Sequence, residues 1–374
     1  MVHVVVSGAF AGVEAHVARL ARAQAERGDR VVVVGGDVGR VRQAAGPGVR
    51  VHPGASLREA WASLAALRAG ADVLHAHMTA AELLAVAAAG APTTARHLPV
   101  VATRHFAQVR GRSLPGRVAS RMIRPRLAAQ VAISRYVADA VGEPSVVVPP
   151  GVGPAGADAL GGASPPRAAD REPVVLMVQR LEPEKRTDLG VRAFAASGLA
   201  ARGWRLDVAG DGSLRDDLAR LVSRSGLTGS VRLLGERRDV AARMGRAALL
   251  LAPCPAEGLG LSVLEAMAAG LPVVAADAGG HVETLGGLDP AALWRPGDAD
   301  DGGRCLAVLA ASPARRDVLA DAALDRQRSG YTPAAQATAT DAVYRDALHR
   351  AAARRSVRQG AALDSPPLGS GRAS

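Results

Sequence analysis

Short apolar runs alternate with helical patterns along most of the 374-residue chain. Helical stretches such as Val13–Arg27 and Leu57–Arg68 separate one apolar run from the next. Alternation of this kind predicts a parallel sheet covered by helices. The runs interpreted as strands are Val2–Ser7, Val31–Val34, Val73–His75, Val100–Thr103, Val131–Ile133 and Val146–Val148, followed after a gap by Val174–Val178, Arg205–Ala209, Val231–Leu234, Ala248–Leu251 and Pro272–Ala275.

The gap between the two series of strands is rich in Pro, Gly and Ala, a composition typical of a linker. The chain is also too long for one ordinary core and suits two domains of about 150–200 residues. We therefore predict an α/β fold with two doubly wound, Rossmann-like domains, at 1–150 and 173–330, joined by a linker at 151–172. Ligand sites in such sheets lie at the carboxyl ends of the strands, so facing domains would form a cleft.

Composition narrows the remaining possibilities. The two cysteines, Cys254 and Cys305, do not indicate a disulfide framework. No apolar run reaches the length of a membrane span, and no basic region precedes the first apolar run, so a cytoplasmic location is expected. The tail 351–374 is rich in Arg, Gly, Pro and Ser without an apolar face, which predicts disorder.

The formal net charge of +11 raises the question of nucleic-acid binding. Aromatic residues make up only 2% of the chain, which argues against stacking on single strands. Of 46 Lys plus Arg residues one is a lysine, Lys185, and the chain contains no asparagine. This bias suggests a GC-rich bacterial genome. A lysine retained where arginine is the default indicates a role for a compact charge, with chance as the alternative.

The segment Glu257-Gly-Leu-Gly-Leu-Ser-Val-Leu-Glu265 is the strongest functional pattern. A glycine turn leads into an apolar helical run, which we expect to begin near Leu261 and to place Glu265 about one turn inside the helix. A helix N-terminus attracts anions through its free N–H groups and its dipole. Carboxylates on either side suit a ligand whose phosphates are flanked by hydroxyls, as in a nucleotide sugar. The alternative is a helix with an acidic first turn.

Several segments, in order, resemble glycosyltransferase family 4, whose members are retaining enzymes of GT-B fold. They cover about residues 1–350. The matching segments are Ala11-Gly-Val-Glu-Ala-His-Val-Ala-Arg-Leu-Ala21, Val146-Val-Val-Pro-Pro-Gly-Val152, Val178-Gln-Arg-Leu-Glu-Pro-Glu-Lys-Arg186, Leu206-Asp-Val-Ala-Gly-Asp-Gly-Ser-Leu-Arg215, Val231-Arg-Leu-Leu-Gly235, Glu257 to Glu265, and Tyr331-Thr-Pro through Tyr344. This chain has Ala11-Gly12 where the family often has Gly-Gly, Pro150 where it often has Asn, and Gln179 where it often has Gly. The last departure adds a side chain to a loop that the family brings close to the donor. The helix at 331–350 resembles the one that crosses back to the first domain.

The resemblance implies transfer of a sugar from a nucleoside diphosphate to an acceptor hydroxyl with retention. Arg180 and Lys185 would bind the diphosphate, assisted by the N–H groups of Gly258, Leu259 and Gly260. Glu265 would hold the ribose hydroxyls, and Glu257 would hold hydroxyls of the transferred sugar. The family is thought to react on one face of the sugar, so no protein nucleophile is expected.

Further positions follow from the same resemblance. His105, after the strand Val100–Thr103, matches a family histidine near the donor sugar, with a polar loop residue as the equal alternative. His75 and His77 end another strand and could line the acceptor side. Gly12 would let the first loop approach phosphate or acceptor closely.

No metal or other cofactor is expected. Asp298-Ala-Asp300 fits the Asp-x-Asp pattern of metal-dependent glycosyltransferases, but we interpret it as a solvated turn. Two other functions stay open: a noncatalytic sugar-nucleotide-binding partner and a sugar-nucleotide epimerase on the same fold. The donor base, the sugar and the acceptor are left undetermined by the residues.

Seven arginines lie between positions 104 and 126: Arg104, Arg110, Arg112, Arg117, Arg121, Arg124 and Arg126. Helical spacing would place Arg117, Arg121 and Arg124 on one face, beside Val118 and Met122. Such a face could contact an anionic membrane surface or an anionic acceptor. The alternative is a solvated face enriched in arginine by codon bias.

Overall fold

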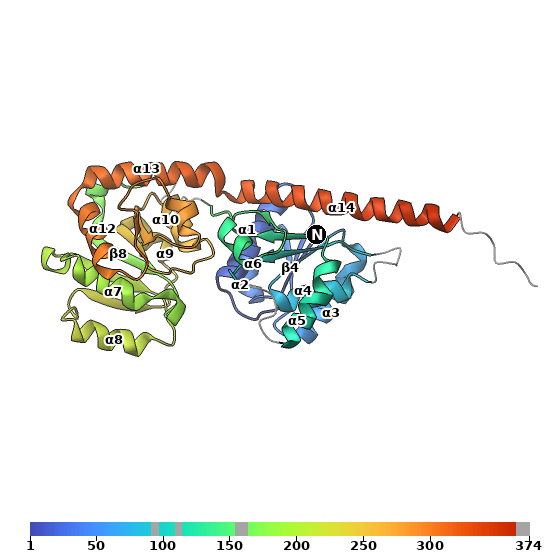
Figure 1. The fold of residues 1–374 in the computed structure, drawn as a ribbon, viewed down its shortest axis with the longest axis horizontal. Coiled ribbons are helices and arrows are strands. Elements are labelled where there is room, and N and C mark those ends of the chain that lie inside the picture. Colours follow the sequence, from blue (N-terminus) through green and yellow to red (C-terminus); the bar gives the residue numbers. More distant parts are fainter. Residues whose placement is uncertain (91–96, 109–113, 154–163, 364–374) are drawn as a thin grey trace, which may run out of the picture. The chain divides into compact units, whose positions relative to one another are not determined.

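The computed structural model describes residues 1–90, 97–108, 114–153 and 164–363. The chain packs as two compact units (Figure 1). The first comprises Met1–Arg104, Arg110–Val131 and Ala337–Ser374, and the second comprises His105–Val109 and Ala132–Gln336. Packing thus groups three chain segments into the first unit, and the sequence-based domain boundaries stay predictions.

A seven-stranded sheet has the order β3-β2-β1-β4-β5-β6-β7. Its strands are β1 (Val2–Val5), β2 (Val31–Val34), β3 (Val49–His52), β4 (Leu74–His77), β5 (Val100–Arg104), β6 (Ala129–Ala132) and β7 (Val146–Val147). β1 pairs in parallel with both β2 and β4, so the order reverses there and the predicted doubly wound sheet is confirmed. Sequence analysis missed β3, an edge strand in which valine alternates with Arg50 and His52.

Helices cover both faces of this sheet. Alternation along β1 directs Val4 to one face and His3 to the other. On the Val4 face lie α3 (Leu57–Leu67) and α4 (Thr79–Ala88), whose Leu64 and Ala85 join one apolar cluster. On the opposite face, α1 (Gly12–Glu26) and α2 (Val38–Ala45) pack against β2.

The second unit contains a six-stranded sheet of order β10-β9-β8-β11-β12-β13. β8 pairs in parallel with β9 and with β11, so this sheet also reverses its order at a central strand. Its strands are β8 (Glu172–Val178), β9 (Arg205–Ala209), β10 (Val231–Gly235), β11 (Ala247–Ala252), β12 (Val273–Ala276) and β13 (Leu293–Trp294), and its helices are α6 (Arg135–Val141), α7 (Thr187–Ala196), α8 (Arg215–Arg224), α9 (Val240–Arg246), α10 (Leu261–Ala268), α11 (His281–Leu285), α12 (Ala299–Ala311) and α13 (Pro313–Gly330).

Close helix packing stabilises the second unit. α12 approaches α7 through Gly303, where an added Cβ would lie 2.8 Å from the Cβ of Ala196. Phe194 and Trp294 are fully buried in the same core. Burial of large apolar side chains stabilises each by about 1.5–3 kcal/mol. This core fixes the strand ends from which the candidate site is built.

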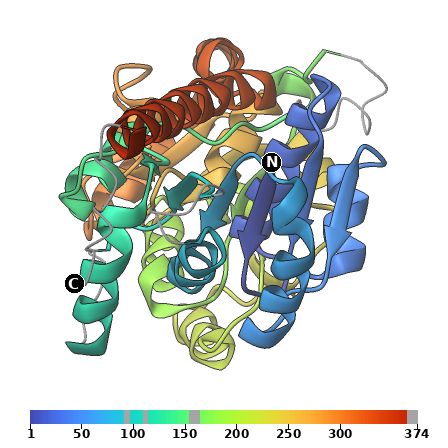
Figure 2. The ribbon, with the colours of Figure 1, turned by 90° about the vertical axis from the view of Figure 1, so that its right-hand side faces the viewer.

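The C-terminal helix α14 (Pro333–Leu363) is longer than expected, and it is drawn in red in Figures 1 and 2. The prediction of disorder from 351 is wrong for 351–363, because the small Ala-rich residues and the arginines there continue the helix. Residues 364–374 lie outside the described part of the chain. From Ala337 onward α14 packs with the first unit, where Ala337 contacts Leu20 and Ala23 of α1. Among the described residues, no helix is long and apolar enough to cross a membrane.

Candidate active site

The candidate site of the second unit lies where β8 and β11 are neighbours. In a doubly wound sheet the ligand site lies at the carboxyl ends of the strands where the order reverses. Residues after β8 include Lys185, and residues after β11 include Glu257. Two segments separated by about seventy residues of sequence are therefore brought together by the strand order.

Lys185 and Glu257 form an ion pair, with 2.6 Å between Nζ and Oε2. Their side chains are 18% and 24% exposed, so the pair is partly accessible to solvent. Burial alone would raise the pKa of Glu257, but the Lys185 ammonium and its hydrogen bond hold that pKa below the usual value. The carboxylate is thus kept ionised beside the only lysine in the sequence.

A tight turn positions Lys185 at the end of the short 3-10 helix η4 (Pro183–Lys185). The next residue, Arg186, adopts a left-handed backbone conformation with φ of 50°. The Gln179 side chain donates from Nε2 to the carbonyl oxygen of Lys185 at 3.1 Å and to Thr187 Oγ1 at 2.9 Å. Gln179 was seen in the sequence only as a departure from the family, whereas here its amide braces the lysine turn.

The loop 257–260, which we call the donor loop, leads from β11 into α10. Gly260 has φ of +91°, a conformation that favours glycine, and α10 begins at Leu261 as predicted. Glu265 therefore lies one turn inside the helix and is partly buried. Gly258 and Leu259 are buried. The geometry expected for a helix N-terminus after a glycine turn is confirmed.

Arg180 does not join the Lys185–Glu257 pair. Its side chain is 60% exposed and Nη2 donates to Glu184 Oε1 at 2.8 Å. A long exposed arginine can change rotamer at little cost, and its role as a diphosphate ligand stays a prediction. His105 is buried in the second unit, where its carbonyl oxygen lies 2.8 Å from the position of a Cβ added at Gly258.

Gly12 lies in the first unit, as the exposed first residue of α1. The helix start is closed by Glu14, whose Oε2 accepts a hydrogen bond from the backbone N–H of Ala11 at 2.9 Å. The exposed position of Gly12 is compatible with the predicted close approach of a ligand, which stays a prediction.

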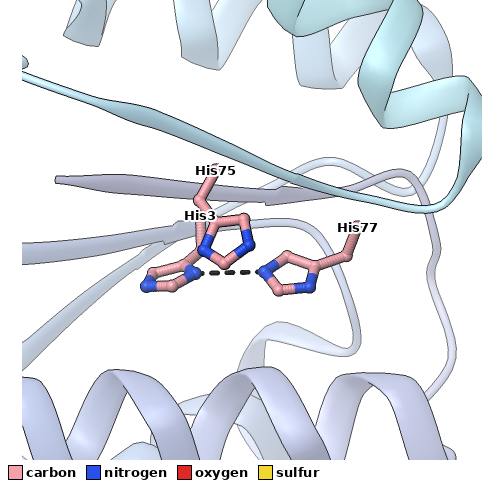
Figure 3. Close-up of side chains that lie close together, drawn as sticks. All are labelled: His3, His75 and His77. Atoms are coloured by element: carbon pink, nitrogen blue, oxygen red, sulfur yellow. Dashed lines mark hydrogen bonds between the residues drawn. The ribbon is translucent and has the colours of Figure 1, made fainter. Parts of the chain in front are cut away.

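His75 and His77 are buried rather than at a surface, with exposures of 1% and 0%. Figure 3 shows both rings facing the ring of His3, which is fully buried. His3 Nδ1 lies 3.1 Å from His77 Nε2, and His3 Nε2 lies 2.8 Å from Gln24 Oε1. The suggestion that His75 and His77 line an acceptor site is therefore wrong for this structure, because parallel pairing of β1 with β4 turns them into the interior.

The ring nitrogens of His3, His75 and His77 lie within 4.8 Å of one another, a spacing that could hold a metal ion. Both nitrogens of His75 already have short contacts, at 2.6 Å to Tyr344 Oη and at 2.6 Å to Thr103 Oγ1. Burial lowers the pKa of His3 to about 4. We interpret the group as a hydrogen-bonded network, which we call the histidine cluster.

Two polar motifs of the sequence take other roles. Asp298 accepts a hydrogen bond from Asp301 N at 3.0 Å as the N-cap of α12, and Asp300 lies within that helix, so the prediction of a turn is wrong for Ala299 and Asp300. Arg104 is buried and pairs with Glu82 at 3.3 Å, so it does not belong to an exposed basic face. Arg110 and Arg112 lie outside the described residues.

Comparison with solved structures identifies the architecture as GT-B, two Rossmann-like domains in one chain. The structure of HepE from Anabaena, in complex with UDP and glucose, has a TM-score of 0.72 at 21% identity and covers 90% of this chain and 96% of its own. Sucrose-phosphate synthase from Thermosynechococcus elongatus has a TM-score of 0.71 at 20% identity and covers 93% and 99%. At this level of identity the likeness concerns the fold.

Two family models together span most of the chain: Glycosyltransferase Family 4 at 10–155 and Glycosyl transferases group 1 at 172–311. The chain belongs to the glycosyltransferase family that these two models describe, family 4 and group 1. Similar curated proteins include 2-deoxystreptamine glucosyltransferase of Streptomyces kanamyceticus, 35% identical over 40% of this chain and 41% of that protein. The lipopolysaccharide core mannosyltransferase LpcC of Rhizobium leguminosarum is 32% identical over 45% and 49%. The chain thus matches less than half the length of these relatives.

Proposed function

We propose that the protein moves a sugar from a nucleoside diphosphate sugar to an acceptor hydroxyl with retained anomeric configuration. The Lys185–Glu257 pair at the carboxyl ends of β8 and β11 carries this proposal. A cation, an ionised carboxylate and the start of a helix occupy the place where a doubly wound sheet binds nucleotides. Glu265, one turn inside α10, supplies the second carboxylate.

In this mechanism the bond between the anomeric carbon and the diphosphate oxygen breaks while the acceptor oxygen bonds to the same carbon. The acceptor proton passes to the departing phosphate. Lys185 and Arg180 stabilise the negative charge that grows on the diphosphate, with the N–H groups of the donor loop. Glu257 orients the sugar hydroxyls and Glu265 the ribose hydroxyls. His105 lies beside the donor sugar, and Gly12 leaves room for phosphate or acceptor.

The transfer is proposed to need no divalent cation. The lysine ammonium and the helix dipole both place positive potential where the leaving group develops charge. Activity that is unchanged in excess EDTA would agree with this, and activity restored only by Mg²⁺ or Mn²⁺ after chelation would contradict it.

The donor class is supported by solved neighbours with UDP and with UDP-glucose. The acceptor is proposed to be a glycolipid, a cell-envelope glycan or a secondary metabolite, because the similar proteins include a 2-deoxystreptamine glucosyltransferase and a lipopolysaccharide core mannosyltransferase. Nucleic acid is not proposed as a partner.

The deciding experiment measures diphosphate release from a panel of nucleoside diphosphate sugars, with and without candidate hydroxyl acceptors. Acceptor-dependent release, with the product anomer equal to that of the donor by NMR, supports retaining transfer. A new sugar nucleotide formed without acceptor would identify an epimerase. Tight nucleotide binding without any turnover would identify a noncatalytic partner.

The helix α5 (Leu114–Ile123) is proposed to contact an anionic membrane surface. Val118 and Met122 are 57% and 58% exposed, whereas Ile123 is buried. Arg121 on α5 and Arg124 and Arg126 in the 3-10 turn that follows it are also exposed. Exposed apolar side chains flanked by arginines match the chemistry of an anionic bilayer interface.

Co-sedimentation with vesicles of phosphatidylglycerol and phosphatidylcholine tests this contact. Changing Arg121 and Arg124 to Gln together with Val118 and Met122 to Ser should abolish binding to the anionic vesicles. The exposed pair Arg220 and Arg224 on α8, changed to Gln, serves as the charge-matched control. Binding that survives these four changes would show that the basic face is merely solvated.

A further inference from the structure

One side of the donor loop is packed against the turn that precedes α11. Gly280 N donates to the carbonyl oxygen of Glu257 at 2.9 Å. An added Cβ at Gly280 would lie 2.4 Å from Leu259 Cα, and one at Gly279 would lie 2.6 Å from the carbonyl oxygen of Glu257. Only glycines permit this approach of two backbones. The position of Glu257 is thus set directly by the turn at 279–280.

The other side of the donor loop contacts Ser134, the N-cap of α6. Ser134 is fully buried, and its Oγ accepts a hydrogen bond from Val137 N at 3.0 Å. The hydroxyl proton is donated to the carbonyl oxygen of Gly258 at 2.6 Å. A Cβ added at Gly258 would lie 3.1 Å from Ile133 Cδ1. The loop is therefore enclosed between two backbone surfaces.

Glu283 joins the two surfaces. It lies on α11, the helix that begins directly after the glycines that hold Glu257, and its carboxylate reaches the start of α6. Oε2 accepts from Arg135 N at 3.0 Å and Oε1 accepts from Tyr136 N at 2.8 Å. A carboxylate at a helix N-terminus is stabilised by both the free N–H groups and the dipole.

These contacts form a closed ring: donor loop, Gly279–Gly280, Glu283, the start of α6, Ser134, and back to the donor loop. We propose that Ser134 and Glu283 are positioning residues that hold the donor loop, and with it Glu257, in the geometry required for sugar transfer. The proposal rests on the proposed function of this site. Neither residue is assigned a contact with substrate.

The ring affects Glu257 directly because the backbone carbonyl of Glu257 is one of its hydrogen-bond acceptors. If the hydrogen bond from Ser134 to Gly258 or the hydrogen bonds from α6 to Glu283 are removed, the donor loop becomes more mobile, while Lys185 still attracts the Glu257 side chain. Small displacements at a reacting centre lower turnover strongly, by as much as about a hundredfold for 1 Å. Donor binding energy spread over the nucleotide should change much less.

Two readouts on the full chain test the proposal. The first is kcat and the donor KM of Ser134→Ala and Glu283→Gln with whichever donor the wild type uses, where kcat should fall about tenfold to a hundredfold and KM should change less than about threefold. Ser134→Thr retains the hydroxyl and should keep most of the turnover. The second is amide hydrogen exchange of the peptide containing residues 257–260, which should be about tenfold faster in both variants.

Matched controls separate positioning from stability. Ser312 caps α13 through Arg315 N, and Asp317 accepts from Ala168 N, both away from the donor loop. Ser312→Ala and Asp317→Asn should lower the thermal midpoint by a similar amount with kcat and loop exchange unchanged. If loop exchange in Ser134→Ala and Glu283→Gln equals that of the controls, the proposal is wrong even where turnover falls. A wild type without turnover would sink the proposed function alone, since loop exchange still decides the positioning role.

Discussion

The Lys185–Glu257 pair of the second unit and the histidine cluster of the first unit differ in kind. The Lys185–Glu257 pair is charged and remains about a fifth exposed. The histidine cluster has ring nitrogens bonded to Gln24, Thr103 and Tyr344, and its members His3, His75 and His77 are sealed from solvent.

The difference teaches how to separate a site from an internal support. A partly exposed ion pair can exchange its internal partner for a charged ligand at modest cost, because water still reaches it. A sealed hydrogen-bonded network can be changed only by breaking hydrogen bonds that no water replaces. We therefore infer that the Lys185–Glu257 pair binds ligand and that the histidine cluster stabilises the first unit.

The largest effect is expected at Lys185. Lys185→Met should lower turnover by about a hundredfold to a thousandfold, as does loss of one charge-stabilising donor elsewhere. Lys185→Arg should restore little, because the planar fork cannot occupy the place of a compact ammonium near Glu257. Steady-state kinetics with the natural donor measure both, and Arg202→Met, an exposed change in the same unit, is the control. A Lys185→Met enzyme with wild-type turnover would show that the Lys185–Glu257 pair, like the histidine cluster, has no role in catalysis.

The histidine cluster should make the first unit sensitive to acid. Burial lowers the pKa of His3 to about 4, below its ordinary 6.5, so the unfolded chain binds the proton first. Stability from the neutral ring is complete above pH 6.5 and is lost as the pH falls from 6.5 toward 4. Between pH 7.5 and 5 the loss is about 2 kcal/mol.

Unfolding free energies of the wild type and His3→Gln at these two pH values check this. The variant should lose less stability than the wild type on acidification, and His52→Gln in the same unit should behave like the wild type. The Glu257 pKa is lowered from 4.5, so the stability from its pairing is lost only below pH 4.5. Equal acid sensitivity of His3→Gln and wild type would show that His3 does not stay neutral in the fold.

Tyr344 should couple α14 to the first sheet. Its hydroxyl lies 2.6 Å from His75 Nδ1, and Tyr344→Phe leaves a buried ring nitrogen without that partner. We expect a loss of about 1–3 kcal/mol. Thr103→Val removes the partner of His75 Nε2 at 2.6 Å, and the two changes should be non-additive because they share one ring. A double-mutant cycle of unfolding free energies measures this coupling, and strict additivity would argue against a network.

Most of the fold could be predicted because strand periodicity is local. β2 and β9 have the predicted bounds, since β-branched or apolar runs end at turns. β3 was missed because an edge strand needs few apolar residues, and the helical character of 351–363 was missed because composition was weighed above helix propensity.

The site was predictable only in part. The Glu257–Glu265 spacing predicted the loop and helix start of the site, and the composition bias singled out Lys185. The fold pairs Lys185 with Glu257 and places Glu265 in α10. Ser134 and Glu283 were missed because each acts through backbone contacts with segments far away in sequence. Gln179 acts locally, on the turn at Lys185 and Thr187. The burial of His75 and His77 depends on pairing with β1, which no local pattern reveals. An amide at a strand end, as at Gln179, is the one local signal that could have been used.

The smallest effect is expected at Cys254, which lies beside the charged pair yet belongs to its support. Burial raises the Cys254 pKa to about 11, and Sγ donates to the carbonyl oxygen of Glu184 at 3.2 Å. Because thiolate is scarce at pH 8, the native protein should react with a disulfide reagent much more slowly than the guanidinium-unfolded chain. Burial also raises the pKa of Cys305, so both cysteines should be protected together.

Cys254→Ser should keep turnover within about threefold, since the hydroxyl can still donate to Glu184. Rapid labelling of Cys254 in the native protein that is blocked by a nucleoside diphosphate would instead show that the thiol is exposed in the site. Cys254 would then be a residue that contacts the ligand, not one that supports the ion pair.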